Sequence, residues 1–137
     1  MMIENPSREE IQSILKQSKR IAVVGLSNNP ERTSYLVSQA MQKAGYQIIP
    51  VNPTIDEVLG EKAVVSLKDI KGEVDIVNIF RRPEYLVDIA QEFLQINCPV
   101  FWAQQGIKNE EAFQMLIEAG KTVVMDRCIK VEHALSK

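Results

Sequence analysis

The chain of 137 residues is long enough to bury a core, and its 45% hydrophobic and 25% charged residues are ordinary for a globular protein. A formal net charge of -2 gives no support for a nucleic-acid or anionic-membrane partner. No apolar run approaches the roughly 20 residues that cross a bilayer. The polar, acidic start MMIENPSREE lacks the pattern of a secretion signal, so we expect a cytoplasmic protein.

Few side chains are suited to metal binding or to catalysis. Cys98 and Cys128 are too few and too far apart for a disulfide framework or a zinc site. His133, the only histidine, lies near the C-terminus, where we expect a surface residue. The sequence therefore predicts no metal site and no catalytic residue. It leaves open whether the protein is an enzyme, and favours the answer that it is not.

Apolar runs bounded by turn residues predict buried strands, and longer stretches with 3.6-residue periodicity predict helices. In chain order we expect a helix at about 7–18, a strand at 21–24, a helix closed by Gly45, a strand at 46–51, a short strand near 63–65 and a brief helix near 67–71. We then expect a strand at 74–80, a helix begun by Pro83, a strand at 98–102, a helix capped by Asn109, a strand at 122–126 and a tail of undecided structure.

Alternation of strands and helices predicts an α/β protein with a mostly parallel, doubly wound sheet covered on both faces. We expect residues 1–137 to form one Rossmann-like three-layer domain, with a core at about 20–127 between the N-terminal helix and a short C-terminal tail.

Ligands of doubly wound sheets bind at the carboxyl ends of the strands, where the strand order reverses. In the common 3-2-1-4 order the first and fourth strands meet at that point. The loop GLSNNPERTS follows the first strand and Arg81-Arg82-Pro83 follows the fourth, so Arg32, Arg81 and Arg82 should converge there. Arginines near a helix N-terminus bind phosphate groups. The alternative is that these arginines are solvated or pair with nearby glutamates.

The loop differs from a dinucleotide fingerprint. Gly25 is its single glycine, and the second strand ends in Asn52-Pro53 instead of an acid for a ribose. Both features argue against NAD. A nucleotide with an extra phosphate fits the arginines better. The hydroxyls of Ser27, Thr33 and Ser34 are candidate phosphate ligands, while Thr33 or Ser34 could equally be a helix N-cap.

Several collinear segments carry a family resemblance: GLSNNPERTSYLV, GYQIIPVNP, EVLGEK, VDIVNIFRRPE, FWAQQGIKNEEA and VVMDRCIKVE. Over about residues 20–132 the chain resembles the small stand-alone CoA-binding proteins, which are similar to the N-terminal CoA-binding domain of the succinyl-CoA synthetase α subunit. The resemblance implies a Rossmann-type fold that binds coenzyme A through the loops after the first, second and fourth strands.

Carried over by motif, the resemblance implies these contacts to CoA: Gly25, Ser27, Pro30, Arg32, Ser34, Asn52, Pro53, Phe80, Arg81 and Arg82. Gln104 and Gly106 would border the pantetheine end. The ligase domain of the synthetase and its phosphohistidine have no counterpart in this chain. The implied function is binding of CoA or an acyl-CoA without chemistry, as a sensor, carrier or accessory module.

Two other functions stay open, an NAD(P)-binding redox protein and the CoA-binding subunit of an acyl-CoA ligase completed by another chain. A homodimer or an unknown protein partner is also possible; co-purification of a partner would favour the ligase subunit, and strict self-association would oppose it. Cys128 follows the last predicted strand, near the same edge of the sheet. Its thiol could form a mixed disulfide with bound CoA, although a buried cysteine acting as a small hydrophobe is the commoner case.

Overall fold

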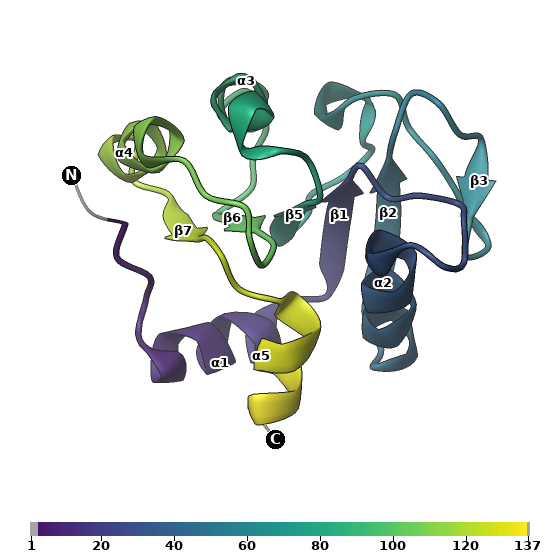
Figure 1. Ribbon diagram of the computed structural model, residues 1–137, viewed down its shortest axis with the longest axis horizontal. Coiled ribbons are helices and arrows are strands. Elements are labelled where there is room, and N and C mark those ends of the chain that lie inside the picture. Colours follow the sequence, from purple (N-terminus) through teal and green to yellow (C-terminus); the bar gives the residue numbers. More distant parts are fainter. Residues whose placement is uncertain (1–2, 137) are drawn as a thin grey trace.

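The computed structural model describes residues 3–136 and shows a parallel five-stranded sheet between two layers of helices (Figure 1). The sheet strands are β1 (Arg20–Val24), β2 (Gln47–Val51), β5 (Ile76–Ile79), β6 (Val100–Ala103) and β7 (Thr122–Val124). The helices are α1 (Arg8–Gln17), α2 (Thr33–Lys43), α3 (Leu86–Phe93), α4 (Glu110–Glu118) and α5 (Ile129–Leu135). Two 3₁₀ turns, η1 (Leu67–Asp69) and η2 (Pro83–Tyr85), and a hairpin of β3 (Glu57–Val58) and β4 (Glu61–Lys62) complete it.

The sheet order is β2-β1-β5-β6-β7, and all of its pairs are parallel. The α/β, Rossmann-like prediction is confirmed. Apart from Asn78 in β5, the buried residues of the central strands are apolar on both faces, as in parallel sheets covered by helices. Ala22 and Val24 belong to the core beneath α3 and α4, whereas Ile21 and Val23 belong to the core beneath α1, α2 and α5.

The order reverses between β1 and β5, whose residues pair from Ile21 with Ile76 to Val24 with Ile79. These are the first strand and the fourth strand of the sequence prediction, so their expected adjacency is confirmed. The chain leaves β1 toward β2 on one side and returns beside β1 as β5 on the other. The loops after β1, β2 and β5 therefore lie at one edge of the sheet.

The strand predicted near 63–65 is wrong, because only one bridge forms there, between Val51 and Val64. The Val64 N–H donates to the Pro50 carbonyl at 2.9 Å, and the Asn52 N–H donates to the Val64 carbonyl at 2.9 Å. Continuing this parallel ladder would require Pro50 to donate to the carbonyl of Lys62. Proline has no N–H, so the ladder stops. Lys62 pairs within the β3–β4 hairpin instead, which the sequence reading did not predict.

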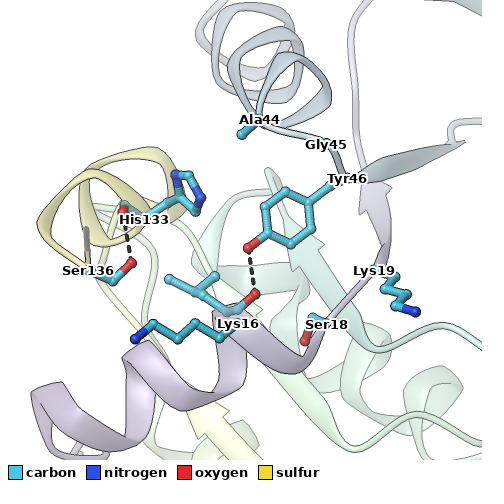
Figure 2. Close-up of a pocket in the computed structure, with 9 residues that line it drawn as sticks. Lys16, Ser18, Lys19, Ala44, Gly45, Tyr46, His133 and Ser136 are labelled. Atoms are coloured by element: carbon cyan, nitrogen blue, oxygen red, sulfur yellow. Dashed lines mark hydrogen bonds between the residues drawn. The ribbon is translucent and has the colours of Figure 1, made fainter.

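The C-terminal segment forms α5, and its position corrects the expectation of a surface His133. The imidazole is half-buried and lies edge-on against the ring of Tyr46, with 5.6 Å between centroids and 82° between planes. The Tyr46 hydroxyl donates to the Leu15 carbonyl at 2.5 Å, which joins the start of β2 to α1. Figure 2 shows His133 and Tyr46 beside each other, and both line a cavity of about 400 Å³. His133 therefore takes part in packing α5 against Tyr46, which in turn is hydrogen-bonded to α1.

Candidate functional site

A cavity of about 630 Å³ lies at the carboxyl edge of β1, β2 and β5. We call it the carboxyl-edge cavity. The predicted site residues that line it are Gly25, Arg32, Asn52, Pro53, Phe80, Arg81 and Arg82. The structure thus brings the three predicted arginines to one cavity at the point where the strand order reverses. Ser27, Pro30, Ser34, Gln104 and Gly106 are not among the described residues that line it.

Gly25 is required by the geometry of this edge. Its φ is +85°, a conformation that residues with a β-carbon rarely adopt. A β-carbon here would stand 2.5 Å from the Phe80 carbonyl oxygen and 3.1 Å from Cδ of Arg81. The absence of a side chain therefore lets the loop after β1 pass close to the loop after β5.

The start of α2 faces this edge with its first turn open. Arg32 is the N-cap, and in the part of the chain that the structure describes its side chain makes no capping hydrogen bond. The alternative that Thr33 or Ser34 is the N-cap is wrong. The Ser34 hydroxyl instead accepts the Ser27 N–H at 3.0 Å, which shapes the loop from inside. The first-turn N–H groups of α2 have no intrahelical partners and carry the positive end of the helix dipole.

Asn52 ties two loops of the cavity together. Its Nδ2 donates to the Leu26 carbonyl at 3.0 Å, in the loop after β1. Its Oδ1 accepts from the Thr54 N–H at 2.9 Å and from the Thr54 hydroxyl at 2.7 Å. The nitrogen and the oxygen of the Asn52 amide both have hydrogen-bond partners within the protein. Asn52 therefore positions the two loops, and we expect neighbouring residues to make most of the contacts with a ligand.

The arginines differ in their surroundings. The Arg81 guanidinium lies over the ring of Tyr85, with Cζ 4.6 Å from the ring centroid. Arg82 has an ion pair with Glu84 at 3.6 Å, in which both side chains are well exposed. Exposed pairs of this kind contribute little to stability, so Arg82 can exchange Glu84 for another anion at small cost. The predicted pairing with glutamate is thus observed at one arginine and does not remove it from the cavity.

Sequence reasoning missed one wall of the cavity. Tyr85, Ile89 and Glu92 line it from the η2–α3 segment, and Val65 and Ser66 line it from the segment after the Val64 bridge. A signal was present, because positions 85, 89 and 92 share one face of a helix that begins directly after the arginines. No sequence pattern predicts that residues 65–66 line the cavity, because their position depends on where the chain leaves the edge of β2.

Gln104 is only 4% exposed, and its side-chain oxygen is engaged inside the protein. This oxygen accepts from Nδ2 of Asn78 at 3.3 Å and from the Ile129 N–H at 3.1 Å. Gly106 is exposed, has a φ of +84° and donates its N–H to Asp126 Oδ1 at 2.7 Å. The two residues hold the loop after β6 against the start of α5. A role for them beside pantetheine stays a prediction.

The cysteines have separate environments. Cys98 is fully buried, and burial raises the pKa of its thiol to about 11. Cys128 is half-buried and is the N-cap residue of α5. Among residues 3–136, no group of histidine, cysteine and acidic side chains could hold a metal ion. Over the same described range, no helix has the length and apolar character needed to cross a bilayer.

Residues 19–134 match the model of a family described as "CoA binding domain". The chain belongs to this CoA-binding domain family. The resemblance drawn from the sequence motifs is thereby confirmed, and the CoA-binding domain spans the sheet, the cavity and most of α5.

Relatives of the CoA-binding domain fall into two groups. The Bacillus subtilis protein YneT, described as uncharacterized, is 67% identical over 98% of this chain and 100% of its own length. A Thermus thermophilus protein of known structure is 40% identical with a TM-score of 0.93, over 96% of this chain and 100% of that chain. The α subunit of an ADP-forming acetate–CoA ligase from Pyrococcus furiosus is 43% identical over 43% of this chain, and the match spans only 13% of that subunit.

Proposed function

We propose that this protein binds coenzyme A, or an acyl-CoA thioester, in the carboxyl-edge cavity and performs no chemistry on it. The observation that carries the proposal is the convergence of Arg32, Arg81 and Arg82 on one cavity beside the open first turn of α2. CoA carries a diphosphate and a 3′-phosphate. Guanidinium forks and helix N-terminal N–H groups are the donors that bind such groups.

The residues present fit the ligand in a second respect. Gly25 leaves room at the point where the loops after β1 and β5 approach each other, and a side chain there would meet Phe80 and Arg81. The phosphates would be held by the arginines and by the start of α2. CoA supplies a thiol that carries acyl groups. The described cavity lining contains no histidine or cysteine that would act on that thiol, which is why we propose binding alone.

The competing NAD(P) function has less support. A dinucleotide is usually held by a glycine-rich turn and by an acid at the end of the second strand. In this protein the second strand is followed by Asn52, whose amide is already hydrogen-bonded to Leu26 and Thr54. This amide is neutral and its oxygen already accepts two hydrogen bonds from Thr54, so it does not supply the charged acceptor that binds ribose hydroxyls.

The test compares ligands by thermal unfolding of the purified chain. We expect CoA to raise Tm and expect NADH and NADPH to leave it unchanged. A ligand present at 100 times its Kd adds about 2.7 kcal/mol of stability. Stabilisation by the dinucleotides with no effect of CoA would overturn the proposal. Mass spectrometry of ligand retained through purification then separates free CoA from acyl-CoA.

A second candidate function is that of a CoA-binding subunit in an acyl-CoA ligase completed by another chain. It is favoured by the match to part of the ligase α subunit from Pyrococcus furiosus. Purification of the tagged chain from its own cells tests it. A co-purifying chain that confers CoA- and ATP-dependent acid activation supports this candidate, and recovery of the chain alone or as a self-associated species opposes it.

A further inference from the structure

One face of the η2–α3 segment forms a wall of the carboxyl-edge cavity. The proposed binding of phosphate groups at the arginines gives this wall no role. Tyr85, Ile89 and Glu92 follow one another at helical spacing and all line the cavity. Val65 lines it as well, and its side chain is 64% exposed. An exposed apolar side chain and a buried isoleucine lining the same cavity suit a flat ring that is apolar on both faces.

The charges of the cavity are separated along this wall. Arg81 and Arg82 lie just before α3, whereas Glu92 lies near its end. Glu92 lies seven positions after Tyr85, which corresponds to roughly 10 Å along the axis at 1.5 Å per residue. Among the described residues that line the cavity, Glu92 is the only one with a carboxylate. The cavity thus has cations at one end and a hydrogen-bond acceptor about one nucleoside length away.

We infer that Glu92 selects the base of the bound nucleotide by accepting a hydrogen bond from the exocyclic amine at C6 of a purine, and so prefers adenine. This inference rests on the proposed function, because it assumes that the phosphates lie at the arginines. A carboxylate accepts hydrogen bonds and cannot donate them when ionised. At C6 adenine presents an amine, whereas hypoxanthine presents a carbonyl oxygen there, which the carboxylate repels.

The polar groups of Ser66, which also lines the cavity, are engaged within the protein. The Ser66 hydroxyl lines the cavity but donates to Asp69 Oδ2 at 3.0 Å. The Ser66 N–H is directed to the same carboxylate oxygen at 3.2 Å. Glu92 itself is exposed, so replacing it should disturb the fold little.

The experiment measures the Kd of CoA and of its deaminated analogue, which has hypoxanthine in place of adenine, by calorimetry. We expect the unmodified protein to bind CoA about tenfold more tightly than the analogue. Glu92→Gln keeps the side-chain length, but its amide can present either an oxygen or an NH₂ group. This variant should accept both ligands with nearly equal Kd.

Asp88→Asn is the matched control. Asp88 lies on the same helix, is exposed and is not among the described lining residues, so the variant removes the same charge from α3. It should keep the tenfold preference. If the unmodified protein binds CoA and the analogue equally, or if Glu92→Gln keeps the preference, the inference is overturned while the proposed function stands. If CoA does not bind at all, both are overturned.

Discussion

Gly25 lies so close to Phe80 that a β-carbon on the glycine would stand 2.5 Å from the Phe80 carbonyl oxygen. Next to this contact, backbone hydrogen bonds between neighbouring strands continue just past the ends of the strands. The Phe80 N–H donates to the Val24 carbonyl at 2.9 Å, and the Gly25 N–H donates to the Val51 carbonyl at 2.9 Å. The loops after β1, β2 and β5 therefore meet at Gly25, and the shape of the cavity depends on the absence of a side chain there.

Replacing this glycine should destabilise the protein for two reasons. Gly25→Ala forces a β-carbon into a positive φ and against a backbone oxygen that cannot move freely. Gly120→Ala is the control, because Gly120 has a φ of +82° but no described atom within 4 Å of the added carbon. We expect Gly120→Ala to cost about 1–2 kcal/mol of unfolding free energy and Gly25→Ala to cost at least about 1 kcal/mol more. Equal losses in denaturant titrations would show that the contact with Phe80 is unimportant.

Arg32 and Arg81 should each contribute to CoA binding. Hydrogen bonds to charged groups contribute about 1.5–3 kcal/mol each, so Arg32→Ala and Arg81→Ala should each raise the Kd of CoA by roughly tenfold to a hundredfold. The arginine that holds the 3′-phosphate is identified by loss of discrimination against 3′-dephospho-CoA. Arg8→Ala, on the exposed surface of α1, should leave the Kd unchanged. An unchanged Kd in both cavity variants would remove the arginines from the site.

Sequence patterns predicted the parts of this protein that follow from burial. Continuous apolar runs placed β1, β2, β5, β6 and β7, and the crossover rule placed β1 beside β5. That adjacency alone predicted that Arg32 would lie near Arg81 and Arg82, and the three residues line one cavity. These inferences held because they depend on the order of the elements and not on the details of any side chain.

The sequence-based predictions were wrong where a single atom or a single contact determines the local structure. The third strand failed because Pro50 lacks the N–H that the ladder required. The N-cap of α2 was misplaced because the Ser34 hydroxyl accepts from Ser27 across the loop, a contact that local propensity does not predict. His133 was expected at the surface because its contact with Tyr46 is between elements far apart in the chain.

Asn52 should affect both stability and binding, although its amide is directed into the protein. Asn52→Ala removes the bonds to Leu26 and Thr54 and leaves the Leu26 carbonyl without this donor. We expect a loss of about 1–3 kcal/mol in unfolding free energy and weaker CoA binding, because the loops after β1 and β2 are no longer tied. Thr54→Val removes only the hydroxyl bond and should cost less. CoA binding unaffected by Asn52→Ala would mean that this link does not position the cavity.

Cys98 should make the stability of the protein fall at alkaline pH. Burial raises the pKa of its thiol from 9.0 to about 11, so the folded protein keeps this proton at pH values where the unfolded chain has lost it. Stability from the neutral thiol is therefore complete below pH 9 and is lost as the pH rises toward 11, by about 2–3 kcal/mol in total. Unfolding titrations of the unmodified protein and of Cys98→Ala should converge over this range, because the variant lacks the group that titrates. If the two curves fall in parallel, Cys98 does not cause the loss.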